Sequence, residues 1–412
     1  MKKKIKAFLI STVFLLIAVP TVLSVTRTIS SSQDNMETFI RNSNGMYWEA
    51  NAGNIQAAID DLVSTNGGWV KIPPGSYDLS STGPIRTYNL SVIIEGATKG
   101  TSWVPDNEYV TRLNCGYNWT SSIEDGRYAI EIGGNETEFT EVTENVIIRD
   151  LLIEGNYNND NQWQGGILMF NCHHCRIENV MVNSFASDGT SGDDTTPDVG
   201  INITSDGSIG SYYNAISNCK LRRNTVGVFI GYNSNANLVD GGTQISNGLN
   251  KDGKYPIGIY IVDGGTNWFT EIDIEDFSDS DGNSSGVYME NTPARPYSGA
   301  NKFLGTRFEG NNRDVYIDST NGGKNKFIGI SSSTYSEYSI YDGASWKSTF
   351  TGCNFYNTTG DYSWSLDSIQ KSTHEPELTH DGLLAYADGT SWNPGSGEGL
   401  YIYYNSQWNY LG

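Results

Sequence analysis

Gly258-Ile259-Tyr260-Ile261 is one copy of a four-residue pattern that recurs through the middle of this chain. Each copy has Ile or Val at its second position, and the spacings between those positions are 34, 27, 31, 28, 28 and 25 residues. The other copies are Gly166-Ile167-Leu168-Met169, Gly200-Ile201-Asn202-Ile203, Gly227-Val228-Phe229-Ile230, Gly286-Val287-Tyr288-Met289, Asp314-Val315-Tyr316-Ile317 and Ser339-Ile340-Tyr341-Asp342. A period of this length with strand-like units predicts a solenoid, because each repeat must stack on the next to bury its apolar residues.

A second pattern, an Asn followed two residues later by a Phe, runs in step with the first. It occurs at Asn267, Asn301 and Asn325, and it leads into stretches where apolar and polar residues alternate, such as residues 269–275. Alternation at period two is typical of a strand with one buried face. Each repeat therefore holds at least two short strands separated by polar corners, which is a coil of a parallel β-helix. About seven to eight coils are expected between residues 145 and 357.

Two motifs precede the repeats, Asn54-Ile55-Gln56-Ala57-Ala58-Ile59-Asp60-Asp61-Leu62 and Gly67-Gly68-Trp69-Val70-Lys71-Ile72-Pro73-Pro74-Gly75-Ser76-Tyr77. They resemble the start of the pectate-lyase superfamily, whose right-handed parallel β-helix proteins include polysaccharide lyases, glycoside hydrolases, epimerase-like proteins and virus tailspikes. The resemblance covers residues 50–360 and implies a fold more specifically than an activity, because one fold hosts many activities. The spacing of Ile55, Ala58, Ile59 and Leu62 predicts a short helix, with Asn54 as its N-cap, that covers the open end of the solenoid.

The chain divides into five predicted segments. Residues 1–24 are a signal peptide or an uncleaved N-terminal anchor, because lysines precede an apolar stretch from Ala7 to Val19. The remaining segments are a linker (25–50), an all-β right-handed parallel β-helix with its capping helix (51–362), a second linker (363–380) and a small C-terminal β module (381–412). The last segment is similar to short modules of virus and phage tail proteins. We expect a secreted or cell-surface protein whose contact with a membrane is limited to an uncleaved N-terminal segment.

The net charge of −21, from 47 acidic and 26 basic residues, limits the partners. It argues against nucleic acid and against anionic membrane surfaces. A neutral or weakly charged glycan suits this surface better than a polyanion, which would need Ca²⁺ or a local basic patch. Asn-x-Ser/Thr sequons at Asn89, Asn118, Asn135, Asn202, Asn283 and Asn357 would make a glycoprotein in a host that glycosylates secreted chains.

Five cysteines do not make a disulfide scaffold in a chain of 412 residues. Cys219 and Cys353 fall in the inward frame of the second strand and are expected to be small core residues. Cys172-His173-His174-Cys175 invites a zinc interpretation. Because strand residues alternate between faces, however, two inward and two outward side chains are the favoured interpretation, and no metal site is predicted there.

Equivalent residues of successive coils stack about 4.8 Å apart, so outward columns are readable from sequence. One such column follows the inward Ile/Val and contains Phe229, Tyr260, Tyr288, Tyr316 and Tyr341. Aromatic rings offer flat apolar area with a polar tip, which suits sugar rings, so these five residues are the predicted substrate-binding residues. The alternatives are plain strand propensity, or burial under a loop or a neighbouring subunit.

Two residues further along the same face, Glu290 and Asp318 occupy adjacent coils beside the tyrosines. Stacked carboxylates resist ionising together, and a pair of this kind is what acid–base glycoside hydrolysis needs. Glu290 and Asp318 are therefore the predicted catalytic pair, with a solvated acidic face or a Ca²⁺ site as the alternatives. Another outward pair, Glu275 and Glu309, ranks lower because Asp273 stacks on Arg307 beside it and the group is better explained as an ion-pair cluster.

Residues 188–198 form the densest acidic cluster, and a bound Ca²⁺ there is left open as the only cofactor. The cluster superficially resembles polygalacturonase elements, but its aspartates are too close together and the Gly-His-Gly and Arg-x-Lys elements of that family are missing. Arg295 is a lone loop arginine, so the signature of classical pectate lyases is missing too.

These observations predict a protein that binds, and as a hydrolase or lyase depolymerises, extracellular polysaccharide. The alternative is a non-catalytic surface or virion-like spike or adhesin that uses the solenoid as a rigid stalk. Analogy with tailspikes leaves a homotrimer open.

Overall fold

A computed structural model describes residues 38–97, 110–115, 128–133, 142–155, 163–186, 198–207, 209–249, 255–292, 299–318, 320, 323–332, 338–344, 348–353, 371–372, 384–404 and 406–411. The predicted signal or anchor, most of both predicted linkers, the acidic cluster up to residue 197 and the sequons at Asn118, Asn135 and Asn357 lie outside these residues. Among the described residues, no helix is both long and apolar enough to cross a membrane.

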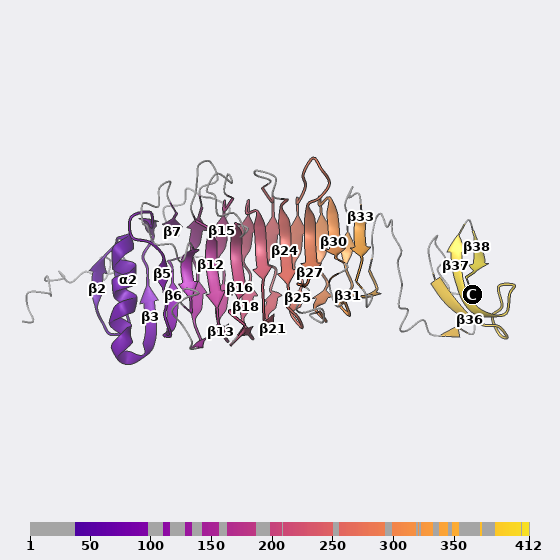
Figure 1. The fold of residues 1–412 in the computed structure, drawn as a ribbon, viewed down its shortest axis with the longest axis horizontal. Helices are drawn as coiled ribbons and strands as arrows, with labels where there is room; N and C mark the ends of the chain where they lie inside the picture. The colour runs from indigo at the N-terminus through magenta and orange to yellow at the C-terminus, as the bar shows by residue number, and fades with distance from the viewer. Residues whose placement is uncertain are drawn as a thin grey trace, which may run out of the picture. The chain divides into compact units, whose positions relative to one another are not determined.

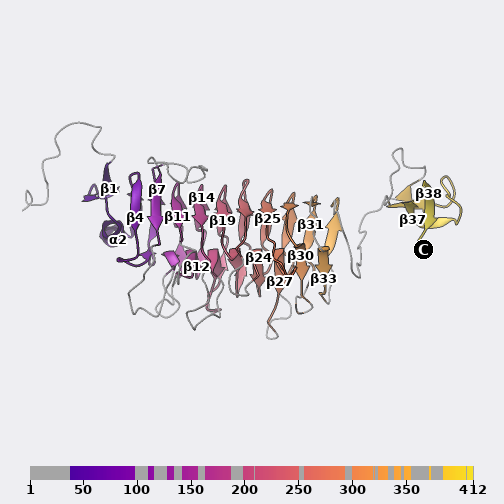
Figure 2. The ribbon, with the colours of Figure 1, turned by 90° about the horizontal axis from the view of Figure 1, so that it is seen from above.

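Three sheets of stacked strands form the coils, and apart from the first two described strands their strands lie side by side in sequence order (Figures 1 and 2). Within the described residues, sheet A has twelve strands: β2 (Tyr47–Glu49), β1 (Phe39–Asn42), β3 (Gly67–Lys71), β6 (Ser91–Glu95), β10 (Ile147–Arg149), β14 (Arg176–Glu178), β18 (Ala215–Ser217), β22 (Leu238–Asp240), β25 (Trp268–Thr270), β28 (Lys302–Leu304), β31 (Lys326–Ile328) and β34 (Thr349–Thr351). From β3 to β34 every neighbouring pair in sheet A is parallel.

The other two large sheets have nine strands each in the described part of the chain. Sheet B consists of β4 (Gly75–Asp78), β7 (Thr111–Asn114), β11 (Leu152–Glu154), β15 (Met181–Asn183), β19 (Lys220–Arg222), β23 (Gln244–Ser246), β26 (Asp273–Glu275), β29 (Arg307–Glu309) and β32 (Ser331–Ser332). Sheet C consists of β5 (Ile85–Arg86), β8 (Tyr128–Ile132), β12 (Gly165–Phe170), β16 (Val199–Thr204), β20 (Val226–Ile230), β24 (Ile257–Val262), β27 (Ser285–Glu290), β30 (Arg313–Ile317) and β33 (Tyr338–Asp342). A coil therefore holds three principal strands, one more than the minimum of two that the sequence indicates.

Sheet D is a smaller sheet at the corner between sheets C and A. Its strands are β9 (Thr143–Glu144), β13 (Cys172–His173), β17 (Ser211–Tyr212) and β21 (Ser234–Asn235) in the described residues. Together the parallel ladders of sheets A to D make stacked coils, as the sequence period predicts.

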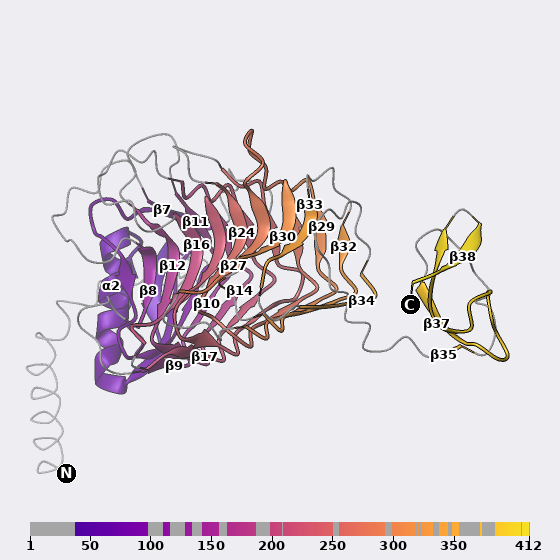
Figure 3. The ribbon, with the colours of Figure 1, turned by 45° about the vertical axis from the view of Figure 1, so that its right-hand side comes forward.

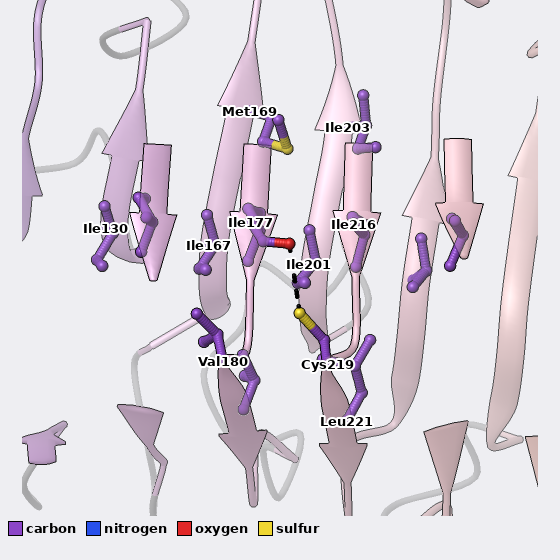
Figure 4. Packing of buried hydrophobic residues seen from close by; sticks show 14 of the residues in the cluster. Ile130, Ile167, Met169, Ile177, Val180, Ile201, Ile203, Ile216, Cys219 and Leu221 are labelled. Carbon is purple, nitrogen blue, oxygen red and sulfur yellow. Dashed lines mark hydrogen bonds between the residues drawn. The ribbon is translucent and has the colours of Figure 1, made fainter. Parts of the chain in front are cut away.

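The predicted inward column is confirmed. Ile201, Val228, Ile259, Val287, Val315 and Ile340 pair directly from coil to coil and are all buried. Figure 4 shows the same arrangement further toward the N-terminus, where Ile130, Ile167 and Ile201 face Val180, Cys219 and Leu221 across the core. Burial raises the pKa of the Cys219 thiol to about 12, so this residue is a small core side chain, as predicted.

Glycine precedes the inward Ile or Val because the interior is crowded at that position. A Cβ on Gly258 would lie 2.5 Å from the carbonyl oxygen of Gly286 and 2.6 Å from Ile274 of sheet B. The repeated glycine therefore lets sheet C approach sheet B closely.

A ladder of buried asparagines leads into sheet A. The side-chain amide of Asn214 donates to Asn237 at 3.0 Å, Asn237 donates to Asn267 at 3.1 Å, and the chain continues through Asn301 to Asn325. Beside it, the inward Phe269, Phe303, Phe327 and Phe350 stack with ring centroids 4.3, 4.9 and 4.8 Å apart. The recurring Asn-x-Phe pattern therefore corresponds to two structural columns, one of asparagines and one of phenylalanines.

Helix α2 (Ala52–Asp60), the first helix of the described residues, continues as the 3-10 helix η2 (Asp61–Thr65) and lies beside the first coils (Figures 1 and 3). Its stripe of Ile55, Ala58, Ile59 and Leu62 is buried, as predicted. The predicted N-cap was wrong: Asn51 caps the helix, and its side chain accepts from the backbone N–H of Asn54 at 3.0 Å. The predicted linker 25–50 also contains β1 and β2, because β1 pairs with β3 and buries Ile40.

The C-terminal segment forms its own sheet of β35 (Lys371–Ser372), β36 (Leu384–Asp388), β37 (Glu398–Tyr404) and β38 (Gln407–Tyr410). β36, β37 and β38 pair antiparallel in succession, as expected for a hairpin-like module. Trp392 and Tyr401 are buried in this unit, and Trp408 packs against them.

Candidate functional site

One outward column on the outer face of sheet C runs through the predicted site. Direct coil-to-coil pairs place Asn202 next to Phe229, then Tyr260, Tyr288, Tyr316 and Tyr341. The structure thus brings together all five predicted substrate-binding residues, which we call the tyrosine column (Phe229, Tyr260, Tyr288, Tyr316 and Tyr341). Their binding role stays a prediction.

The rings of the tyrosine column contact one another along its whole length. Phe229, Tyr260 and Tyr288 meet edge to face with centroids 5.3 Å apart. Tyr288, Tyr316 and Tyr341 are stacked nearly parallel, with centroids 5.3 and 4.7 Å apart. The parallel half therefore presents a continuous row of rings, and Tyr341 at its end is 40% exposed.

Glu290 and Asp318 occupy adjacent coils beside this column. The sheet C register pairs Met289 with Ile317, and the backbone N–H of Asp318 donates to the carbonyl of Met289 at 2.8 Å, so the ladder continues to Asp318. The two backbones are therefore one strand spacing apart, about 4.8 Å. The structure places the predicted catalytic pair side by side, and its chemistry stays a prediction.

Both oxygens of the Glu290 carboxylate accept hydrogen bonds from the tyrosine column. The Tyr260 hydroxyl donates to Oε1, and the Tyr288 hydroxyl donates to Oε2 at 3.2 Å. Asp318 is held differently, since its Oδ1 accepts from the backbone N–H of Thr320 at 2.8 Å. Glu290 is thus fixed by two side chains, one from the preceding coil and one from its own strand.

The tyrosine hydroxyls are held in their protonated, donating form. Burial is the largest cause that raises the pKa of Tyr260, followed by its hydrogen bond to Glu290. The pKa of Tyr288 is raised by burial first and then by the charges of Glu290 and Asp318. These hydroxyls therefore act as donors and not as bases at neutral pH.

Arg313 is a cation at this site that sequence reasoning missed. Its guanidinium lies 4.9 Å from the centroid of the Tyr316 ring and donates to Asn283 Oδ1 at 2.8 Å. The signal was present, since Arg313 stands two residues before the inward Val315 where earlier copies have apolar or small residues. It places a positive charge against the tyrosine column.

The same column extends toward the N-terminus into a buried polar group that the sequence also did not reveal. Glu131 has a fully buried side chain, and its Oε2 accepts from Arg86 Nε at 2.8 Å. Its Oε1 has no hydrogen-bond partner in the described part of the chain. Burial, the largest cause, raises the pKa of Glu131 in spite of Arg86. No recurring motif marks these residues because they precede the first copy of the pattern.

The Glu275/Glu309 pair is an ion-pair cluster, as the lower-ranked interpretation held. Arg307 pairs in register with Asp273, and its guanidinium contacts Glu275 at 3.2 Å as well as Glu309. All of these groups keep solvent contact on sheet B.

We expect Arg307→Ala to lower the free energy of unfolding by less than about 1 kcal/mol, because exposed ion pairs are screened by water. Urea unfolding at low and high salt measures this, and a loss of several kcal/mol would contradict the assignment of a surface ion pair.

The Cys-His-His-Cys segment does not converge on a metal. Cys172 and Cys175 are buried, whereas His173 and His174 lie on the outside, where their rings pack on Tyr212 and Tyr213. Within the described residues no group of three or more His, Cys, Asp or Glu side chains is arranged to hold a metal ion.

The sequon at Asn202 is corrected by the structure. Asn202 is buried and donates to the Tyr128 hydroxyl at 2.7 Å, so this sequon is no glycan acceptor in the folded chain.

The chain resembles solved structures, whereas the sequence comparisons find no match. No protein-family model matches the chain, and no curated protein sequence matches it. An alginate lyase from Paenibacillus sp. is similar in structure, with a TM-score of 0.51 and 12% identity over 75% of this chain and 94% of that chain. This likeness shows the right-handed parallel β-helix and confirms the fold predicted from the pectate-lyase-like motifs.

Two virus proteins also match, with lower scores. One is the ORF18 protein of Geobacillus virus E2, at a TM-score of 0.47 and 18% identity over 73% of this chain and 57% of that chain. The other is a tailspike protein of Acinetobacter baumannii bacteriophage Fri1, a capsular polysaccharide depolymerase, at a TM-score of 0.39 and 13% identity over 74% of this chain and 51% of that chain. This chain therefore spans little more than half the length of either virus protein.

Proposed function

We propose that this chain is a secreted or cell-surface protein that binds extracellular polysaccharide along the tyrosine column and hydrolyses it with Glu290 and Asp318. The observation that carries the proposal is the Glu290 carboxylate, held by the hydroxyls of Tyr260 and Tyr288 within a row of contacting rings. The rings supply apolar faces for sugars, and the carboxylates supply proton transfer beside them. The alginate lyase with this fold acts on a polysaccharide, which agrees with a glycan ligand.

The two carboxylates take different roles in this proposal. Glu290 accepts hydrogen bonds from two hydroxyls, which fix the orientation of its carboxylate, so in this proposal it serves as nucleophile or base. Asp318 then serves as the acid that protonates the glycosidic oxygen. The backbones of the two residues are one strand spacing apart, about 4.8 Å, and a separation of about 5 Å between the carboxyl groups themselves would suit a retaining mechanism.

The test of activity is incubation with a panel of polysaccharides, followed by assays for new reducing ends and for the ultraviolet absorbance of unsaturated ends. New reducing ends without unsaturation support hydrolysis. Unsaturated ends would overturn the assignment of a hydrolase in favour of a lyase.

A non-catalytic spike or adhesin is the second candidate, favoured by one observation. Both oxygens of Glu290 are already occupied by tyrosine hydroxyls, and a carboxylate satisfied in this way can serve binding alone. A homotrimer fits this candidate by analogy with tailspikes. Glycan binding without product would decide for it.

The triple variant Tyr260→Ala, Tyr288→Ala, Tyr316→Ala is expected to weaken binding by at least about 1 kcal/mol for each ring that anchors a sugar. Isothermal titration calorimetry with the polysaccharide that binds in the panel measures this. The matched variant Tyr260→Phe, Tyr288→Phe, Tyr316→Phe keeps the rings and should retain most of the affinity. Trp268→Ala, which removes an exposed aromatic side chain from sheet A, is the control for nonspecific loss. Unchanged affinity in a folded triple alanine variant would rule out the tyrosine column as the glycan-binding surface.

A further inference from the structure

We infer that the tyrosine column is blocked at its Phe229 end and open at its Tyr341 end, so that this protein engages a polysaccharide by a terminus and not across the middle of the polymer. This inference deepens the proposed function and rests on it.

The outer face of sheet C is covered on its N-terminal coils. An outward residue of a solenoid meets solvent unless other atoms pack over it, yet Leu168 is only 3% exposed and Asn202 only 9%. The neighbouring outward positions are equally buried and belong to one apolar cluster that is separate from the interior: Tyr128, Leu168, Phe170, Val199 and Val226. A glycan therefore cannot lie on these coils in this conformation.

The change from covered to open occurs at the first ring of the tyrosine column. Phe229, Ile257 and Tyr260 are partly buried and pack against the apolar cluster. Beyond them Tyr288 and Tyr316 are half-buried, and Tyr341 at the end of the column is 40% exposed. The cluster therefore forms a wall at one end of the row of rings, and the other end is open.

A buried hydrogen-bonded pair, Asn202 and Tyr128, forms part of the wall. Asn202 pairs directly with Phe229 in the column, and its Nδ2 donates to the Tyr128 hydroxyl at 2.7 Å. Its Oδ1 is buried and has no partner among the residues that the structure describes. Because this acceptor is buried, a bound sugar does not reach it, and Asn202 and Tyr128 belong to the wall behind Phe229.

The wall also sets the position of the carboxylates relative to a bound chain end. Two strand spacings, about 10 Å, separate the coil of Phe229 from the coil that carries Tyr288 and Glu290. A chain end seated against Phe229 would therefore be cut a short distance from its terminus, and the product would be a short oligosaccharide.

The test counts binding sites per mass of polymer with the wild-type full chain. Alginate, xylan and dextran are each presented intact and after graded partial acid hydrolysis, which raises the number of chain ends at constant mass. Calorimetry gives the moles of protein bound at saturation, and a reducing-end assay on each finished titration counts the ends that are present, including any formed by cleavage.

Binding to chain ends predicts that the saturation value per mass rises in proportion to the number of ends. If the protein binds but the saturation value per mass stays flat or falls as the number of ends rises, the blocked end of the column is overturned. The proposed function is then left intact. Failure to bind any of the three polymers, intact or hydrolysed, would remove the proposed function and the inference with it.

Two variants give an independent readout on the polymer that binds. For its shortest bound fragments, Tyr260→Ala near the wall should lower affinity about tenfold, which corresponds to about 1.4 kcal/mol, and Tyr341→Ala should lower it much less. For long fragments the two variants should have comparable effects, with Trp268→Ala as the control. Equal losses on the shortest fragments would contradict a fixed, closed end.

Discussion

Asn267→Ala is expected to lower the free energy of unfolding by about 4 kcal/mol. Asn267 Oδ1 accepts from both the backbone N–H and the side-chain amide of Asn237, and its own amide donates to Asn301 and to the carbonyl of Ser234. The site is fully buried, so the groups that lose Asn267 cannot turn to water. Each stranded buried group costs about 1–3 kcal/mol, and several are stranded together.

Urea unfolding followed by circular dichroism measures this loss. The matched control is Asn54→Ala, which removes an asparagine that makes one side-chain hydrogen bond, to the carbonyl of Glu49, and should cost well under about 1 kcal/mol. A loss for Asn267→Ala as small as that of the control would show that the ladder is not a stabilising column.

The stacking of the coils was predictable because it depends on residues that recur. The inward Ile and Val positions, the outward tyrosines and the Asn-x-Phe frame are each repeated with the coil, so alignment of the copies is equivalent to their register in the sheet. Cys219 was placed correctly from the same frame. A period fixes neighbours across coils even without any knowledge of side-chain conformations.

Features that occur once were not predictable in this way. The Arg86–Glu131 pair precedes the recurring pattern, and β1 joins sheet A from a segment that has no repeat. The N-cap moved by three residues to Asn51, since several polar residues near α2 offered a cap. The hydroxyl contacts of Glu290 depend on rotamers of Tyr260 and Tyr288, and sequence alone fixes the columns but not where their polar tips meet.

The sequence pattern likewise did not distinguish the covered part of the outer face of sheet C from its open part. Leu168 and Tyr316 occupy the same outward column, yet the first is buried and the second is accessible. What lies over an outward residue is set by segments between the strands, which vary in length and composition from coil to coil. The extent of the accessible part of the tyrosine column therefore emerged only from the burial of individual side chains.

Glu290→Gln is expected to lower kcat for polysaccharide hydrolysis by at least about 100-fold while the affinity for the same polysaccharide changes little. The amide keeps the shape of the side chain and an oxygen that can accept from a tyrosine hydroxyl, but it carries no charge to act as nucleophile or base. Asp318→Asn should lower kcat by a similar factor, because the pair acts as a unit. Reducing-end assays at saturating polysaccharide measure kcat, and calorimetry measures binding.

The control is Glu309→Gln, which removes a carboxylate from the ion-pair cluster of Arg307 on sheet B and should leave both kcat and affinity near the wild-type values. Tyr260→Phe separates positioning from chemistry: it removes one of the two donors to Glu290 and should lower kcat less than Glu290→Gln does. Product formation by Glu290→Gln at the wild-type rate would exclude this carboxylate from catalysis. A wild-type protein that binds the polysaccharide but releases no product would instead assign the hydrogen-bonded Glu290 to glycan binding, and the β-helix would then serve as a spike or adhesin.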